Sequence, residues 1–357
     1  MEVFTGHLST SLFHNSVFTM ADNQSDIFKT PSKPARRRAS KQWNEILIPE
    51  SPMMKVIGYG TGINVSLLER GTPRRITQRS PWAVKRLSRR VHVAPEQAAR
   101  LAREAELLRR LRHPCVVGYR GVAAGSAPGS VALLMEAASA SLMDLIETRA
   151  ESEPDPGPFP LSAIATVGLD IASALHYLHT DQHLLHGDLK SANVLVFGAF
   201  QRAKLCDFGV SLPLNNQLAV TGDQTYVGTE PWSAPEVVFD GDVTHKTDIY
   251  SYALTLWEMF ALEMPHASDL PDLDNSELSS DSEMDDSTGS DGYFESQMGV
   301  PPPVPQLGAA LMAEYRPFVE IYTVCSAVRA GDRPAAEQCC HLFRPLCPRP
   351  ETDGKAA

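Results

Sequence analysis

The sequence has no apolar run that approaches the roughly 20 residues needed to cross a bilayer as a helix. Its first 19 residues also lack a basic start followed by a continuous apolar stretch, which is the pattern of a secretory signal. Both absences argue against a membrane-bound or secreted protein. We therefore expect a cytoplasmic or nuclear location and no binding to membranes.

Cysteine is scarce and is not arranged for metal binding. No two cysteines form a CxxC pair, and no histidine cluster complements them at the spacing of a zinc site. Reduced thiols are the expected state in an intracellular protein. The chain contains Cys115, Cys206, Cys325, Cys339, Cys340 and Cys347.

Basic residues are absent from residues 269–295, which contain ten Asp or Glu. The formal net charge of the chain is −11, so the remainder of the chain is nearly neutral and gives no reason to expect nucleic acid as a partner. We expect residues 268–296 to form a disordered acidic insert. Three interpretations remain open: a solubilising loop, an attractor for basic substrates, or a target of an acid-directed kinase at Ser280 or Ser282.

The order of hydrophobic patterns divides the chain into a β-rich part followed by an α-rich part. Strands are expected from about Met53 to 136, with one amphipathic helix at 95–112. Four arginines at 70–79 predict a solvated basic loop. Helices are expected at 161–179 and at 248–262, where residues are apolar all round, as in a buried helix.

These patterns predict one two-lobed domain between two tails. Residues 1–50 are expected to be a mostly disordered, basic, Ser/Thr-rich tail, and residues 346–357 a C-terminal tail. The domain covers residues 51–345. Its expected parts are an N-terminal lobe at about 51–135, a hinge at about 136–140 and a C-terminal lobe at about 141–345.

Short motifs with chemical meaning follow one another along this domain. A glycine cluster at 58–62 lets a hairpin pass close to phosphates, because side chains there would clash. Ala83-Val84-Lys85 ends a strand, and Glu104 lies on the next predicted helix. Glu106 is expected to point about 200° away from Glu104 as a solvated charge. Each of these signals is weak alone.

Three further motifs come later, in a fixed order. They are His186-Gly187-Asp188-Leu189-Lys190-Ser191-Ala192-Asn193, Asp207-Phe208-Gly209 and Ala234-Pro235-Glu236. Together with the glycine cluster, Lys85 and Glu104, they resemble the motif series of eukaryotic protein kinases over about residues 50–345. The resemblance implies a bilobal α+β fold, with a β-rich lobe that contains one helix and an α-rich lobe.

The resemblance also implies ATP and Mg²⁺ as cofactors and protein hydroxyls as substrates. It implies that Asp188 accepts or orients the hydroxyl proton, that Lys190 neutralises the γ-phosphate, and that Asn193 and Asp207 bind Mg²⁺. Lys85, paired with Glu104, is expected to hold the α- and β-phosphates. The expected nucleotide contacts are Ile57, Gly58, Tyr59, Gly60, Thr61, Gly62, Val65, Ala83, Lys85, Met135, Glu136, Ala138, Leu195 and Asp207.

Structural roles follow from the same resemblance. Leu108, His186 and Phe208 are expected to stack between the lobes. Asp248 is expected to brace the catalytic loop, and Arg333 to pair with Glu236.

Lys190 and Thr229 favour specificity for serine and threonine. Residues 205–211 and the hydroxyls of Thr221 and Thr225 resemble the MAP kinase kinase group, which implies a MAP kinase among the substrates and leaves dual specificity open. Thr30-Pro31 suits phosphorylation by an upstream proline-directed, cyclin-dependent kinase.

Three departures qualify the resemblance. Gly187 replaces the arginine that receives an activation-segment phosphate in other kinases, and Ile63 stands where the third glycine of the loop is usual. Lys355 occupies the Ser/Thr position of a C-terminal PDZ ligand, so PDZ binding is not expected. A pseudokinase scaffold that binds nucleotide without efficient turnover, and a small-molecule kinase, remain alternatives.

Overall fold

The computed structural model describes most of the expected domain. All described elements belong to one unit, Glu45–Ala357. The expected tail at 1–50, the expected acidic insert at 268–296 and nearly all of the expected tail at 346–357 lie outside the described residues. The described residues are 55–60, 63–72, 75–88, 95–124, 131–152, 156–222, 224–267 and 299–347.

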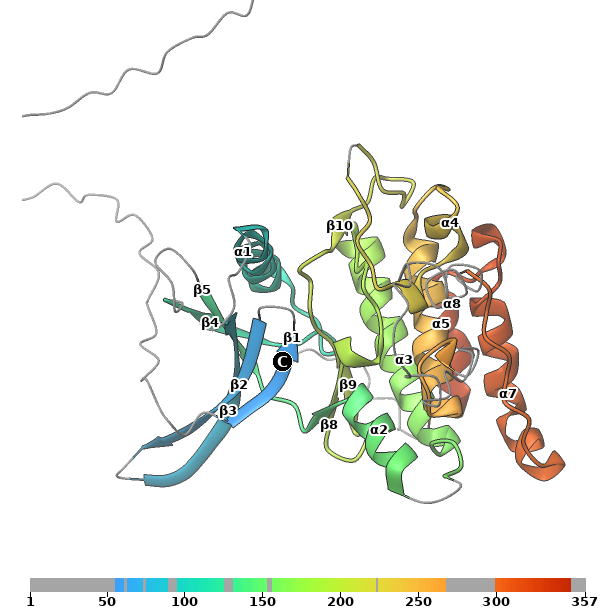
Figure 1. Ribbon diagram of the computed structural model, residues 1–357, viewed down its shortest axis with the longest axis horizontal. Helices are drawn as coiled ribbons and strands as arrows, with labels where there is room; N and C mark the ends of the chain where they lie inside the picture. Colours follow the sequence, from blue (N-terminus) through green and yellow to red (C-terminus); the bar gives the residue numbers. More distant parts are fainter. Residues whose placement is uncertain are drawn as a thin grey trace, which may run out of the picture. The chain divides into compact units, whose positions relative to one another are not determined.

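A five-stranded antiparallel sheet and one helix form the β-rich part (Figure 1). The strand order is β1-β2-β3-β5-β4. Helix α1 (Pro95–Arg110) buries Leu101, Ala105 and Leu108, one face of the predicted helical pattern. The strands are β1 (Lys55–Gly60), β2 (Ile63–Thr72), β3 (Arg75–Leu87), β4 (Tyr119–Ala124) and β5 (Val131–Glu136).

The prediction of a basic loop at 70–79 was wrong. Strands β2 and β3 continue through this region, with Arg70 opposite Arg79 and Thr72 opposite Arg75. Clustered arginines indicated exposure, but exposure does not oppose strand pairing. The β-branched Thr72, Ile76 and Thr77 favour an extended backbone here.

Helices dominate the remainder of the described chain, as the α+β class requires. Figure 1 shows α3 and α5 beside one another, and α3 also packs against α8. The predicted fold class is confirmed. The helices are α2 (Leu142–Ser152), α3 (Leu161–His176), α4 (Pro235–Val238), α5 (His245–Ala261), α7 (Ala309–Cys325) and α8 (Ala336–Phe343).

Helix α5 is the buried helix expected from the sequence, and it begins three residues earlier than predicted. Thr244 caps it: its side chain accepts a hydrogen bond from the Lys246 amide, and Thr247 reaches back to the Thr244 amide. The helix ends at Ala261, because the next residue, Leu262, has a left-handed φ of 61°. The residues that flank the helix therefore determine where it begins and where it ends.

Short elements frame the motif-bearing loops. Strands β6 (Ala140–Ser141), β8 (Val194–Phe197) and β9 (Arg202–Leu205) form one small sheet, and β7 (Leu184–Leu185) pairs with β10 (Leu212–Pro213). The segment 186–193 thus lies between β7 and β8. Single helical turns occur at Tyr177–Asp181, Ser191–Asn193, Glu230–Trp232, Ala330–Asp332 and Arg344–Leu346.

One described stretch, Leu161–Asp181, is long and apolar enough to cross a membrane by length and composition. Within the protein, 67% of its most apolar window is buried. Its Asp170 is also buried and accepts a hydrogen bond from the Ala203 amide. These features are typical of a core helix.

Candidate active site

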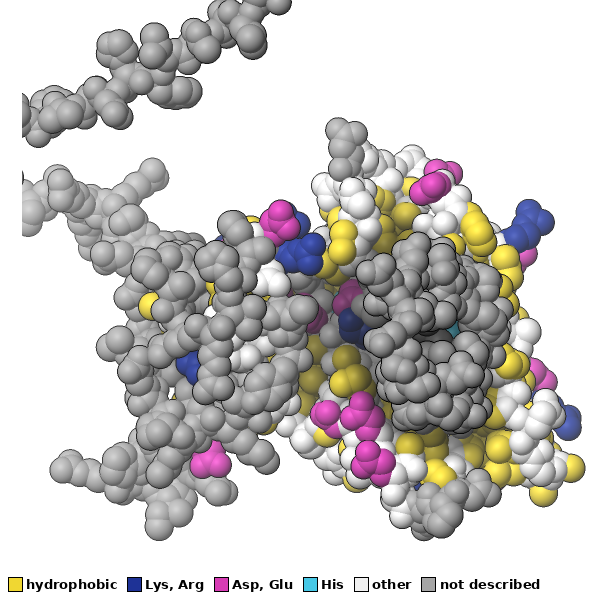
Figure 2. Space-filling model, viewed as in Figure 1, with side chains coloured by type: hydrophobic (Ala, Val, Ile, Leu, Met, Phe, Trp, Pro, Cys, Tyr) yellow, Lys and Arg dark blue, Asp and Glu magenta, His cyan; other side chains and the backbone are white. Residues whose placement is uncertain are grey.

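A buried ion cluster joins β3, α1 and the segment after β9. Nζ of Lys85 lies 2.8 Å from Oε2 of Glu104 and 2.8 Å from Oδ1 of Asp207. The Lys85 and Glu104 side chains are 7% and 2% exposed, whereas Asp207 is 39% exposed. In Figure 2, basic and acidic side chains meet between the strand-rich and helical regions. The structure therefore brings together three residues that the sequence indicated separately.

Charge pairing outweighs burial at Lys85 and Asp207, whereas at Glu104 burial outweighs the pairing and raises the pKa to about 7. Burial would lower the pKa of Lys85, but the carboxylates of Glu104 and Asp207 raise it above its usual value. Desolvation would likewise raise the pKa of Asp207, but the ammonium of Lys85 lowers it. The cluster thus keeps a lysine cation and an Asp207 anion in contact at neutral pH.

The carboxylate of Asp188 is held by three side-chain donors. Thr229 Oγ1 donates to its Oδ1 at 2.5 Å, Lys190 Nζ lies 3.0 Å from its Oδ2, and Asn193 Nδ2 donates to the same Oδ2 at 3.0 Å. Lys190 also donates to Thr229 at 2.5 Å. Because Thr229 belongs to the segment before α4, these contacts tie that segment to the 186–193 loop.

Asp248 fixes the backbone of this loop from α5. Its carboxylate accepts hydrogen bonds from the amides of His186 (2.8 Å) and Gly187 (2.9 Å), and it lies 2.8 Å from Nε2 of His179. Burial would raise the pKa of Asp248, but His179 and the other partners lower it. This is the bracing contact that the resemblance implied.

The Asp207-Phe208-Gly209 segment has an unusual backbone. Asp207 has a φ of 64°, a left-handed value that is uncommon for a residue other than glycine. The Phe208 ring packs edge-on against His186 at 5.2 Å between centroids, and Leu108 belongs to the same buried cluster. This packing holds Asp207 in a sparsely populated conformation beside Lys85.

The structure reveals one residue that the sequence analysis missed, Glu258 on α5. This buried carboxyl accepts hydrogen bonds from Trp232 Nε1 (2.6 Å) and from the hydroxyl and amide of Ser191. It therefore links the 186–193 loop to the turn before α4. Burial raises its pKa to about 8. A carboxylate in the mostly apolar second half of α5 was the only signal available in the sequence.

Glu236 and Arg333 form the expected pair. The guanidinium of Arg333 donates to both carboxylate oxygens of Glu236, at 2.7 and 2.8 Å, and its side chain is fully buried. Thr247 also donates to Glu236 at 2.8 Å. This two-pronged contact fixes α4 against the helical core.

The residues expected to contact the nucleotide base lie on both sides of the hinge, the link between β5 and β6. Ala83 and Met135 face each other across β3 and β5 and are buried, and Val65 lies opposite Lys85 on β2. Leu195 lies on β8, and Ala138 in the link between β5 and β6.

Glu136, the last residue of β5, is occupied by other contacts. Its amide donates to the Gly118 carbonyl, and its carboxylate accepts from the Gly118 amide and from Lys204. The Glu136 amide is therefore not available to a nucleotide base.

The glycine cluster is described only in part. Gly58 and Gly60 lie in β1, Gly60 opposite Ile63, and Ile57 is 42% exposed. Thr61, Gly62 and the Tyr59 side chain lie outside the described residues, as does the candidate phosphorylation site Thr30.

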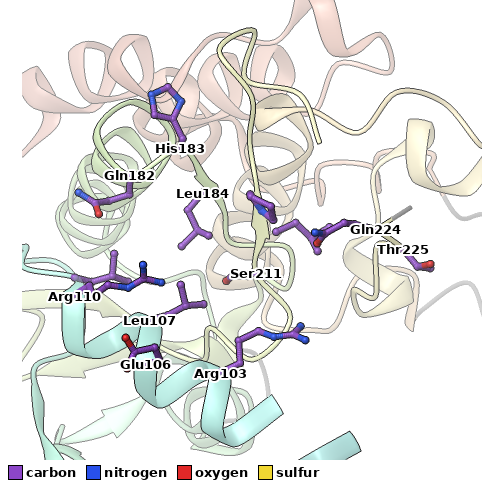
Figure 3. Close-up of a pocket in the computed structure, with 13 residues that line it drawn as sticks. Arg103, Glu106, Leu107, Arg110, Gln182, His183, Leu184, Ser211, Gln224 and Thr225 are labelled. Carbon is purple, nitrogen blue, oxygen red and sulfur yellow. The ribbon is translucent and has the colours of Figure 1, made fainter. Parts of the chain in front are cut away.

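A cavity of about 940 Å³ lies on the side of α1 that faces the β7–β10 pair and the 224–225 segment (Figure 3). Its α1 wall includes Arg103 and Arg110, and Thr225 lies at its border. Neither arginine forms an ion pair with another described residue. Glu106, also in this wall, is exposed and bonds Arg109 at 2.6 Å.

Protein ligands alone do not complete a metal site. Among the described residues, no group of three His, Cys, Asp or Glu side chains could hold a metal ion. Asn193 and Asp207 provide two oxygen ligands, which suits a hard cation whose remaining ligands are phosphate oxygens and water. The donor set therefore fits a cation that arrives with a nucleotide.

The ion cluster yields a stability prediction. Lys85→Met leaves the Glu104 carboxyl buried without its cation, so we expect the free energy of unfolding to fall by about 3 kcal/mol. Adding Glu104→Gln to this variant removes the buried charge and should recover much of the loss. Chemical denaturation of the two variants and the wild type measures this. No recovery in the double variant would contradict the argument.

A second prediction concerns Glu258 and pH. Its pKa of about 8 in the folded protein exceeds the usual 4.5, so its contribution to stability is complete below about pH 4.5 and is lost as pH rises through 8. Glu258→Gln preserves the shape and removes the titration. We expect wild type to lose about 3 kcal/mol more than the variant between pH 5.5 and 8.5. If the free energies of unfolding of the two proteins change equally with pH, this assignment is refuted.

Comparison with known proteins identifies the family. The protein kinase domain family matches residues 53–342. The chain is 40% identical over 316 residues to lymphokine-activated killer T-cell-originated protein kinase of Homo sapiens, which covers 87% of this chain and 95% of that protein.

Two further relatives match shorter segments. MAP kinase kinase skh1/pek1 of Schizosaccharomyces pombe is 36% identical over 178 residues, or 49% of this chain and 47% of that protein. A probable serine/threonine-protein kinase of Dictyostelium discoideum is 32% identical over 227 residues, or 63% of this chain and 20% of that protein. The expected resemblance is confirmed: the chain belongs to the protein kinase family and is an ATP-binding serine/threonine kinase similar to MAP kinase kinases.

Proposed function

We propose that this kinase transfers the γ-phosphate of ATP, bound with Mg²⁺, to serine and threonine hydroxyls of protein substrates at a centre formed by Asp188, Asn193 and Asp207. The observation that carries this proposal is the pair of linked clusters around Lys85 and Asp188. The cluster around Lys85 offers the lysine cation and the Asp207 carboxylate to a metal-bound triphosphate. The cluster around Asp188 holds that carboxylate in a fixed position beside Lys190 and the hydroxyl of Thr229.

In this proposal each residue has a separate role. The carboxylate of Asp188 accepts the proton of the attacking hydroxyl, and Lys190 neutralises charge on the transferred phosphoryl group. Asn193 and Asp207 would hold the Mg²⁺ ions, which would supply positive charge to the phosphates. Lys85, held by Glu104, orients the α- and β-phosphates. Catalysis is then mainly positioning and electrostatic stabilisation.

The contacts of Thr229 support a preference for serine and threonine. Its hydroxyl is shared between Lys190 and Asp188, so the substrate-facing segment reaches directly to the carboxylate.

We further propose that a MAP kinase is among the substrates and that Thr30 is phosphorylated by a proline-directed kinase. The relative named as a MAP kinase kinase supports the first proposal. Thr30-Pro31 in the sequence supports the second. A cytoplasmic or nuclear location would suit both. The scaffold alternative is less favoured, because Lys85, Asp188, Asn193 and Asp207 are all present and in contact with charged or polar partners.

The central test is phosphate transfer from radiolabelled ATP to a panel of protein substrates. Asp188→Asn keeps the shape of the side chain but removes the proton acceptor, so we expect transfer to fall by about 1,000-fold or more. Nucleotide affinity, measured by fluorescent ATP analogue binding, should change little. Equal transfer by both proteins would overturn the mechanism, and nucleotide binding without transfer by wild type would favour the scaffold.

A second test addresses the candidate phosphorylation sites Thr221 and Thr225, both exposed. Gly187 offers no cation to a phosphate there, although Arg103 and Arg110 in the cavity wall would attract one on Thr225. We expect Thr221→Ala/Thr225→Ala to lower activity by about tenfold at most, because phosphate modulates this segment without being required. A loss of about 1,000-fold in the same transfer assay would show that the segment depends on phosphate.

A further inference from the structure

Gly187 belongs to the catalytic loop, residues 186–193, and has no side chain to fill the space beside it. The activation segment, residues 207–236, fills that space. The φ of Gly187 is 80°, and a Cβ added there would lie 3.3 Å from the carbonyl oxygen of Val210. An arginine would therefore be strained at this position whatever its partner. The next nearest atom to that Cβ is Cε2 of Tyr226, at 3.9 Å.

A second glycine makes room for the same ring. A Cβ added to Gly228 would lie 2.5 Å from both Cε1 and the hydroxyl oxygen of Tyr226, closer than real contacts allow. The Tyr226 ring thus lies between Gly187 of the catalytic loop and Gly228 of its own segment. Gly228 must lack a side chain for the ring to remain there, whereas Gly187 is required by its positive φ and by the Val210 carbonyl.

The hydroxyl end of Tyr226 reaches α5. It lies beside Ser251, and burial raises the pKa of the phenol well above its usual value, so the ring stays neutral. The Ser251 hydroxyl in turn donates to the Trp232 carbonyl at 2.8 Å. Ser251 lies three residues after Asp248, which holds the amides of His186 and Gly187.

Apolar contacts extend the same anchor. Tyr226 packs against a small buried cluster of Leu185, Leu212 and Leu214, with Val220 and Val243 at its edge. These residues come from β7, from β10 and from the segment after it. The ring therefore holds the catalytic loop, α5 and the two ends of the activation segment at one point.

We propose that Tyr226 is a positioning residue that anchors the activation segment against the catalytic loop in place of a phosphate–arginine pair. The anchor rests on the packing of the Tyr226 ring, and it requires no modification of the chain. Its effect on catalysis rests on the proposed function and acts through Thr229, which follows three residues later and bonds Asp188. Thr225, the neighbouring residue, borders the cavity beside α1 and remains exposed (Figure 3).

The test compares Tyr226→Ala, Tyr226→Phe and Gly228→Ala with Gln224→Ala, an exposed position in the same segment. Protein phosphorylation and ATP dependence are measured for each variant. Loss of the ring should lower kcat/KM for the protein substrate by about 100-fold, because it misplaces Thr229 by an ångström or so. The KM for ATP should stay within about twofold, since the ATP-binding residues do not contact this ring.

The other variants separate anchoring from general destabilisation. Tyr226→Phe keeps the ring and removes only the hydroxyl beside Ser251, so it should lose no more than about fivefold. Gly228→Ala displaces the ring without removing it and should resemble Tyr226→Ala. Gln224→Ala should match wild type. A Tyr226→Ala or Gly228→Ala protein that retains more than about half of the wild-type kcat/KM would overturn the proposal.

Hydrogen exchange keeps this test independent of the proposed function. If wild type transfers no more phosphate than Asp188→Asn, the proposed function fails, but the anchor can still be measured. Backbone amides of 219–232 should exchange faster in Tyr226→Ala than in Gln224→Ala, with α3 unchanged as an internal reference. Equal exchange in the two variants would refute the anchor by itself.

Discussion

The arrangement of the 186–193 loop depends on the hydrogen bonds that the buried carboxylate of Asp248 accepts. It binds two consecutive backbone amides, of His186 and Gly187, and thereby fixes the direction in which Asp188 leaves the loop. Ser251 and Glu258 project from the same side of α5, given 100° per residue, and bond Trp232 and Ser191. One capped, buried helix therefore positions Asp188 and the segment before α4 together.

A second junction connects this frame to the sheet. Lys85 contacts Glu104 from α1 and Asp207 from the segment after β9, so three separate elements must be in register for the cation to be paired. An unpaired charge in this position would be costly, because the lysine and the glutamate are nearly inaccessible to water. The ion pairs that stabilise the fold therefore form only when Lys85, Glu104 and Asp207 have been brought together.

The backbone at Gly187 is left-handed, a conformation that suits glycine and would strain an arginine. Tyr226 packs beside this position. In the arrangement that we propose, a permanent packing contact takes the place of a phosphate–arginine pair.

The sequence by itself determined the α+β class, the order of elements and the motif residues Lys85, Glu104, Asp188, Asn193 and Asp207, because periodicity and motif spacing are local properties. It could not determine that Arg70 and Arg79 pair within a hairpin, or that the Glu136 amide is already bonded. Only the tertiary structure showed that Glu258 joins Ser191 to Trp232 and that Tyr226 fills the space beside Gly187. Those contacts join residues that are distant along the chain, so they exist only once α5 and both loops are packed together.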